Sequence, residues 1–599
     1  MILIIVYEIK ASTIGTLWIL CTLTMSIIFT LKNYHWIKVF FTHHNYLNIL
    51  FLCAGILISC IHLNVFYYSY DTPKWLIFDL VTSFCIIYFF KNKQTIIFSY
   101  FGVVVLLFIY YMLASIIWAA NKTAAIELSL RFINAVLFIY FLINHFDKDK
   151  LQTIFLNTCF LSALAFSILF YFERYVLGHT NYNVGNYSPI GFMNNAGAVF
   201  NVWIPALILN SIKQFQRKNT FLLITVIITT IAIVSILMEA ATRGTIIGLT
   251  IFEIIVFFMV FRKNKKRAFL YITITSLLLT GMVTYKLSDA LQSGRLEGKF
   301  LALSTNLAAA SDKRIQLYKN TWEMTLDNPM GVGINNFEFN HPKYGKPGTE
   351  FSSPYINENQ ILTTPHNLVL KIYSELGLLF GSVFVLILLY LLITAFINAL
   401  KGCFIDKWLF VALGATLFHS MLSAVLITPV SLFFSCFLIG LIIIRIDYPI
   451  IQLSITTINI PKSVKGLYLI TPFIFIALMY ASYLSFTGYK QDNYEKMKQA
   501  ILINPYHSRT LYNLSFYEIG ANRDTTQSLF YIDQFLKSYP YHISGLQIKA
   551  ERHYQLKEYR LATQTIDHLL HFYPSYQTAN RLKLQINSKV INESSKEQQ

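Results

Sequence analysis

The chain has 599 residues, of which 55% are hydrophobic and only 13% are charged. A soluble protein of this size could not bury so much apolar side chain, so the composition indicates a membrane protein with many spans. The formal net charge of +18 does not indicate nucleic-acid binding, because most of the basic residues in the first 490 positions form short clusters between apolar segments.

Apolar segments long enough to cross a bilayer, at about 17–25 residues each, recur along the first 490 residues. We therefore predict an all-α polytopic membrane protein with about 12–14 transmembrane helices. The candidate segments are residues 12–31, 46–66, 74–90, 95–118, 124–144, 151–172, 192–212, 219–238, 243–261, 268–285, 366–398, 406–426, 429–445 and 464–486.

Basic residues occur in every second connection between these segments, as in Lys213–Lys218 and Arg262–Arg267. Short basic connections face the cytoplasm, so the polar stretch 286–365 and the chain after residue 488 are expected on the opposite face. The predicted parts are residues 1–285 with the N-terminal spans, 286–365 as one large loop, 366–488 with the C-terminal spans, 489–591 as helical repeats and 592–599 as a polar tail.

The C-terminal region contains three proline turns at a regular spacing. Pro505, Pro540 and Pro574 are separated by 35 and 34 residues, and each lies beside a tyrosine. Helix pairs that end in proline at a 34-residue period are typical of tetratricopeptide repeats. The alternative is an irregular helical tail, since a short array is predicted from few positions.

The large loop, residues 286–365, is expected to be ordered. Its first helix is predicted over Arg314–Leu326, with an apolar face at helical spacing. Pro329, Gly331 and Gly333 predict a turn between two ordered pieces. The predicted apolar face consists of Ile315, Tyr318, Trp322 and Leu326, and the predicted small core of the loop consists of Trp322, Phe337, Phe339 and Tyr344.

Arg243 is a candidate functional cation, because it lies at the outer end of a predicted span. Gly244 and Gly248 follow it and allow close approach, so the arginine could hold an anionic headgroup. The alternative is an arginine that extends to the interface or pairs with Glu239. We favour function, because an arginine at a helix N-terminus opposes the helix dipole.

His366 and Asn367 follow Pro365 at the predicted start of a span. The positive end of a helix lowers the pKa of a nearby histidine and favours the neutral imidazole, which is the form that a general base needs. Arg314, taken alone, is interpreted as a solvated surface residue. No nucleotide-binding, metal-binding or redox motif is present, so we predict no cofactor and no metal site.

These residues occur in an order that resembles the O-antigen ligase family, which includes bacterial protein O-oligosaccharyltransferases. The resemblance extends over about residues 180–390, and the segment Gly191–Phe200, with Asn194 and Asn195, is similar to the family's Asn-rich start of a central span. The residues that match the family pattern are Arg243, Arg314, Trp322, Pro329, Gly331, Gly333, Phe337, His366, Asn367, Leu370, Glu375 and Gly377.

The resemblance implies a glycan donor on undecaprenyl pyrophosphate and transfer to a hydroxyl group on the periplasmic face of the bacterial inner membrane. It implies His366 as the general base and Arg243 and Arg314 on the diphosphate, which gives a single displacement with inversion and without metal. Asn367, Trp322, Asn194 and Asn195 are expected to support the site. Glu375 is nine residues after His366 and is expected to be a structural partner.

The acceptor stays open at this point, since lipid A core, a protein or a growing polysaccharide would all suit the family. A flippase-type transporter is the alternative from a different class. The repeats would offer a concave surface to a protein acceptor or an assembly partner, and the spans would contact membrane lipid.

Overall fold

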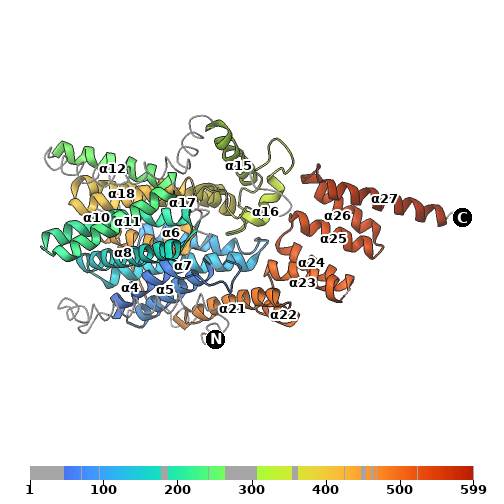
Figure 1. Cartoon of the computed structure of the whole chain (residues 1–599), viewed down its shortest axis with the longest axis horizontal. Coiled ribbons are helices and arrows are strands. Elements are labelled where there is room, and N and C mark those ends of the chain that lie inside the picture. Colours follow the sequence, from blue (N-terminus) through green and yellow to red (C-terminus); the bar gives the residue numbers. More distant parts are fainter. Residues whose placement is uncertain are drawn as a thin grey trace.

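The computed structural model describes residues 46–68, 70–92, 95–176, 187–240, 242–263, 307–353, 362–423, 425–446, 454–459, 465–466, 468–522 and 524–597. The predicted spans at 12–31 and 268–285 lie outside these residues. Within them the chain is an all-α polytopic membrane protein with a helical bundle at one end and a curved helical array at the other (Figure 1).

Eight helices in the described part are long and apolar enough to cross a membrane. These are α5 (Thr72–Asn92), α7 (Lys122–His145), α8 (Lys148–Tyr171), α10 (Met193–Gln216), α11 (Thr220–Ala240), α12 (Arg243–Lys263), α17 (Leu368–Lys401) and α21 (Thr471–Lys490). Three shorter apolar helices in the described part are α4 (Tyr46–Cys60), α6 (Tyr100–Ala114) and α19 (Pro429–Ile444), and the 17-residue helix α18 (Phe404–Ser420) occupies a further predicted span. Each predicted span in the described residues thus has a helix.

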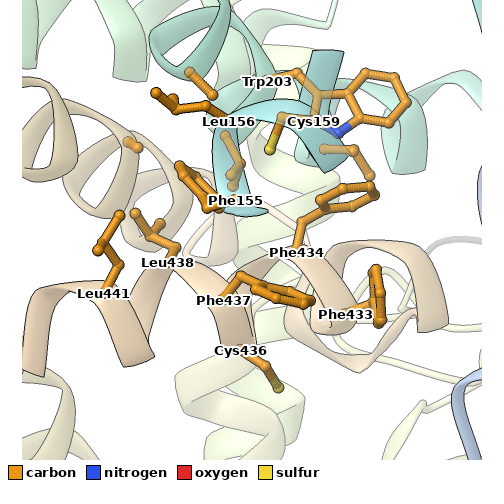
Figure 2. Close-up of a cluster of buried hydrophobic side chains, with 14 of the residues drawn as sticks. Phe155, Leu156, Cys159, Trp203, Phe433, Phe434, Cys436, Phe437, Leu438 and Leu441 are labelled. Atoms are coloured by element: carbon orange, nitrogen blue, oxygen red, sulfur yellow. The ribbon is translucent and has the colours of Figure 1, made fainter. Parts of the chain in front are cut away.

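The core of the bundle surrounds α10, which is buried along most of its length. It carries no charged residue before Lys213, and a helix that is apolar on all sides is expected at the centre of a bundle. Trp203 of α10 packs edge-on against Phe434 of α19, with ring centroids 5.3 Å apart, and Phe155 and Cys159 of α8 lie nearby (Figure 2).

Two short antiparallel sheets were not predicted. β1 (Thr95–Ser99) pairs with β4 (Ser454–Asn459), so the predicted span at 95–118 begins as a strand before α6. β2 (Tyr187–Ser188) and β3 (Gly191–Phe192) form a hairpin that leads directly into α10. The partner of β1 lies more than 350 residues away in the chain, so this pairing depends on the assembled bundle.

In the large loop, α15 (Leu307–Asp327) is longer than predicted, and α16 (Phe337–Tyr344) follows the glycine turn. The predicted apolar face of α15 is wrong, because Ile315, Trp322 and Leu326 are exposed. The buried face contains Leu317, Asn320, Thr321, Met324 and Thr325. Polar side chains can be buried here because they form hydrogen bonds: Asn320 Nδ2 donates to Phe351 O and to Ser353 Oγ, both at 2.9 Å.

The predicted core of the loop forms only in part. Phe337 and Tyr344 are buried together with residues of α15. Trp322 remains 40% exposed, and Phe339 is buried against the C-terminal array. The reason is that α16 lies between α15 and the array, so its alternate residues pack in two directions.

The C-terminal array consists of helices that pack in sequence order, and a proline turn follows every second helix. The assignment of these helices to tetratricopeptide repeats stays a prediction. The helices are α22 (Tyr494–Ile503), α23 (Ser508–Tyr517), α24 (Thr525–Ser538), α25 (Ile543–Gln555), α26 (Tyr559–Phe572) and α27 (Gln577–Glu597). The last helix continues to Glu597, so the predicted polar tail is helical up to that residue.

The array is docked on the bundle and on the large loop. Near its first turn, Asn121 Nδ2 donates to Tyr506 O at 3.3 Å. In the second turn, the ring of Tyr539 packs against Phe339 of α16, with centroids 4.8 Å apart. In the third turn, Ser575 Oγ donates to Gly348 O at 3.4 Å. Since all three turns make such contacts, the loop and the array lie on the same side of the membrane.

We predict that cysteines introduced at Glu350 in the loop and at Gln585 in the array label together with a membrane-impermeant maleimide in intact spheroplasts. Both positions are exposed, and the docking contacts place them on one side. A cysteine at Lys401, on the opposite end of α17, should label only after lysis. Labelling of residue 350 without residue 585 in intact spheroplasts would contradict the docked arrangement.

Candidate functional site

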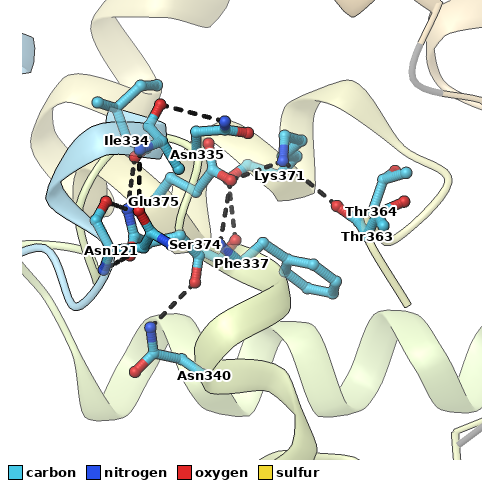
Figure 3. Close-up of polar contacts among 12 residues, drawn as sticks. Asn121, Ile334, Asn335, Phe337, Asn340, Thr363, Thr364, Lys371, Ser374 and Glu375 are labelled. Carbon is cyan, nitrogen blue, oxygen red and sulfur yellow. Dashed lines mark hydrogen bonds and ion pairs between the residues drawn. The ribbon is translucent and has the colours of Figure 1, made fainter. Parts of the chain in front are cut away.

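Two backbone segments lock the large loop to the start of α17 (Figure 3 shows the side chains around this lock). The segment Pro329–Gly333 lies against the segment Ser374–Leu378, where α17 is broken at Gly377. The three bonds run from Val332 N to Ser374 O at 3.0 Å, from Gly333 N to Glu375 O at 2.9 Å and from Leu378 N to Pro329 O at 3.0 Å. The glycine turn and the glycine break thus satisfy each other's backbone groups.

Glycine is required on both sides of this lock. Gly331 and Gly377 have φ angles of 79° and 75°, which residues with a Cβ rarely adopt. A Cβ on Gly331 would lie 2.3 Å from Glu375 O, and a Cβ on Gly377 would lie 2.1 Å from Pro329 O. The position of one glycine in each motif therefore has a steric cause.

Glu375 holds this region together from within. Its carboxylate is fully buried and forms an ion pair with Lys371 Nζ at 2.7 Å. The same carboxylate accepts a hydrogen bond from Phe337 N at 3.2 Å, at the first turn of α16. These contacts link α16 to α17.

His366 lies just before the first turn of α17. Asn367 caps the helix, with its side-chain oxygen accepting from Leu370 N at 3.0 Å. His366 has a φ of 53°, in the left-handed region, and its backbone N–H donates to Thr364 Oγ1 at 3.0 Å. A residue with a Cβ held in this region is strained, and such strain is concentrated at functional sites.

The structure places α15, which carries Arg314, against α17, which begins two residues after His366. Burial of the half-buried imidazole lowers the pKa of His366, and the positive charge of Arg314 on α15 lowers that pKa further. The direction agrees with the sequence prediction, although the causes are burial and Arg314 rather than the helix end. Arg314 itself is exposed, as the sequence suggested, and is available to a ligand.

Trp322 supports this pair from one side. Its ring packs edge-on against Tyr373 of α17, with centroids 5.8 Å apart. The contact joins α15, which carries Arg314, to the helix that follows His366. Trp322 thus helps to fix the position of α15 relative to the start of α17.

Arg243 begins α12, and its side chain is exposed. Thr242 Oγ1 donates to Met193 O at 3.5 Å, so the starts of α12 and α10 lie side by side. Asn194, which is exposed, and Asn195, which is half-buried, occupy the first turn of α10. Within the described residues, no hydrogen bond or ion pair connects Arg243 to Arg314 or His366.

Gly244 and Gly248 do allow close approach, but to another helix. A Cβ on Gly244 would lie 2.5 Å from His419 Cδ2, and a Cβ on Gly248 would lie 3.2 Å from Ala415 O. Both contacts are with α18, so the two glycines form the face on which α12 and α18 pack.

Sequence reasoning missed His419 and Lys371. Both were detectable: His419 is an ionisable residue inside a predicted span, and Lys371 precedes Glu375 by one helical turn. No group of three His, Cys, Asp or Glu residues in the described ranges is arranged to bind a metal ion.

Residues 227–386 match the family model described as O-antigen ligase. The match includes Arg243, Arg314, Trp322, His366 and Glu375, whereas Asn194, Asn195 and the array lie outside it. In the comparison with curated proteins, no protein matched the chain.

We predict that Gly331→Ala destabilises the protein by about 2–5 kcal/mol, as the sum of a left-handed residue with a Cβ and an overpacked contact. Thermal unfolding in detergent and limited proteolysis of the loop measure the effect. Gly520→Ala is the control, because a Cβ at that exposed glycine meets no atom within 4 Å. Equal stability of the two variants would rule out the steric lock.

We predict that His366 reacts with diethylpyrocarbonate at a lower pH than an ordinary histidine does. The reagent modifies the neutral imidazole, and His366 is expected to remain neutral at that pH. The pKa is lowered, so the imidazole gains its proton only at lower pH, and the reaction midpoint shifts in the acidic direction. Arg314→Gln removes one cause and should raise the midpoint. Peptide mass spectrometry follows modification of His366, and a midpoint that does not respond to Arg314→Gln would contradict the coupling.

Proposed function

We propose that this chain, whose residues 227–386 match the O-antigen ligase family model, transfers a glycan from a lipid diphosphate carrier to a hydroxyl acceptor. At the level of the family, it is a membrane glycosyltransferase or ligase. The proposed donor is a glycan on undecaprenyl pyrophosphate, used on the periplasmic face of a bacterial inner membrane.

The observation that carries this proposal is the packing of α15, with its exposed Arg314, against α17, which begins beside the strained, half-buried His366. A neutral imidazole can take a proton, and a neighbouring cation can stabilise an anion. In the proposed step, the acceptor oxygen forms a bond to the anomeric carbon and its proton moves to His366. The bond from that carbon to the diphosphate oxygen breaks, the diphosphate keeps the electron pair, and the configuration is inverted.

Arg243 is the second proposed diphosphate ligand. Its side chain is exposed at the start of α12, beside the first turn of α10 with Asn194 and Asn195. The free backbone N–H groups at a helix start also favour an anion. We assign the two asparagines to donor binding, and Asn367 and Glu375 to holding the start of α17.

The exposed row of α15 suits a reaction at the membrane surface. Ile315, Trp322 and Leu326 are exposed, although all three are apolar. An amphipathic helix of this kind lies in the interface, where tryptophan is enriched. This orientation would hold Arg314 at the height of a carrier headgroup whose polyprenyl chain remains in the bilayer.

The position of the array is relevant to the identity of the acceptor. Its turns contact the bundle and the loop, so the array has a fixed position relative to His366 rather than a flexible attachment. An acceptor bound to the array would therefore be presented from a defined direction, which supports a protein acceptor or a protein partner. Ligation to lipid A core and polymerisation of repeat units are the other outcomes of the same chemistry.

We predict that purified protein transfers a carrier-linked glycan to lipid A core or to periplasmic protein, and that His366→Ala lowers kcat by about 10²–10⁴-fold. Arg243→Ala and Arg314→Ala should each lower the rate by about 10²–10³-fold, as loss of one charge-stabilising group does. Lys319→Ala, which removes another exposed cation from α15, is the control and should keep full activity.

The same assay separates an enzyme from a transporter. A flippase-type transporter would move the glycan lipid across vesicles without forming a new glycosidic bond, and His366→Ala would leave that movement intact. Unchanged transfer by His366→Ala would exclude the base assignment, and a product on only one acceptor class would identify the acceptor.

A further inference from the structure

His419 is a buried histidine at the point where three spans meet. It lies in the last turn of α18, and only 2% of the residue is exposed. Its Nδ1 lies 3.1 Å from Thr245 Oγ1 of α12 and 3.2 Å from Asn201 Nδ2 of α10. Burying a polar side chain inside a membrane costs free energy, so a histidine at this position points to a role that an aliphatic residue could not perform.

The hydrogen bonds define the proton on His419. The hydroxyl of Thr245 donates to Gly197 O at 2.7 Å, so Thr245 Oγ1 can only accept from the imidazole. Nδ1 therefore carries the proton. The amide oxygen of Asn201 is buried without a hydrogen-bond partner. Flipping this side-chain amide places its oxygen near Nδ1–H of His419, where the oxygen serves as a second acceptor.

The ring of His419 also lies directly against the backbone of Gly244. A Cβ on Gly244 would be 2.5 Å from Cδ2 and 3.1 Å from Nε2 of the imidazole. Gly244 is the second residue of α12, and Arg243 is the first. The imidazole thus contacts the first turn of α12 on one side and bonds to Thr245 in that turn on the other.

We propose that His419 is a positioning residue for Arg243. The imidazole fixes the height and rotation of the first turn of α12, because it is both hydrogen-bonded to Thr245 and in steric contact with Gly244. The direction of the Arg243 side chain follows from the orientation of that turn. The inference rests on the proposed function in one respect only, that Arg243 binds the donor diphosphate.

The alternative is that His419 only stabilises the bundle. Two features argue for more than this. The contact is at the start of α12, whereas Gly248 and Ala415 already pack α12 against α18 one turn further along. Moreover, the Thr245 hydroxyl already has its own partner in Gly197 O, so the imidazole is not needed to satisfy it.

The first test measures position without any substrate. A cysteine replaces Arg243, and its labelling by an impermeant maleimide in spheroplasts is compared with and without His419→Leu. The chain that retains Arg243 gives the background. We expect His419→Leu and Gly244→Ala each to change the labelling rate severalfold. His419→Leu removes the hydrogen bond to Thr245, and Gly244→Ala creates a steric clash with the imidazole of His419. His419→Asn keeps a donor for Thr245 and should restore most of the rate.

Ser420→Ala is the matched control. Ser420 is equally buried on the same turn, but its hydroxyl donates only to Thr416 O within α18. Adding His419→Ala to Gly244→Ala removes the clash and should return the labelling rate toward that of His419→Ala alone. Wild-type labelling in both His419→Leu and Gly244→Ala would overturn the inference.

The second test uses transfer activity. His419→Leu should raise the KM for the carrier-linked donor about tenfold, the factor expected for one lost coupled interaction, without changing the KM for the acceptor. Combined with Arg243→Ala it should cause no additional loss, because both act on the same contact. Changed labelling without any transfer activity would reject the proposed function and keep the positional inference. Additive losses with Arg243→Ala would reject the inference.

Discussion

The candidate site depends on the backbone lock between Pro329–Gly333 and Ser374–Leu378. This lock fixes the large loop to the break in α17, and both Arg314 and His366 lie in segments that it connects. A Cβ on Gly331 would overlap with Glu375 O, and a Cβ on Gly377 would overlap with Pro329 O. The two backbone segments are therefore in such close contact that they have little freedom to move relative to each other. A base and a cation that must act on one substrate need such a rigid frame.

Glycines also allow close contact between helices inside the bundle. Gly244 and Gly248 let α12 approach α18, and Gly197 lets α10 approach Thr242 and Thr245. Where helices are in lipid, close packing and hydrogen bonds rather than hydrophobic burial hold them together. As a result, the start of α12, with Arg243, lies beside the start of α10, with Asn194 and Asn195, although the two are distant in sequence.

The array extends the rigid frame out of the membrane. The residues of α16 alternate between the core of the loop and the array, with Phe337 packing on α15 and Phe339 packing on Tyr539. The proline turns that give the array its period are also the positions where it contacts the rest of the protein. The C-terminal helices are therefore part of the architecture around the site and not an attached tail.

The sequence by itself determined the membrane class, the helix in each described span, the order of the motifs and the period of the array. These follow from local properties, namely the length of apolar segments, glycine and proline punctuation, and residue spacing. Only the tertiary structure decided which face of α15 is buried, because Asn320 finds partners at Phe351 and Ser353 that no local pattern reveals. The tertiary structure likewise decided the pairing of β1 with β4, the docking of the array, the packing of α15 against α17 and the contact of His419 with Gly244. Each of these joins segments that are far apart in the chain, so no local pattern reveals the contact.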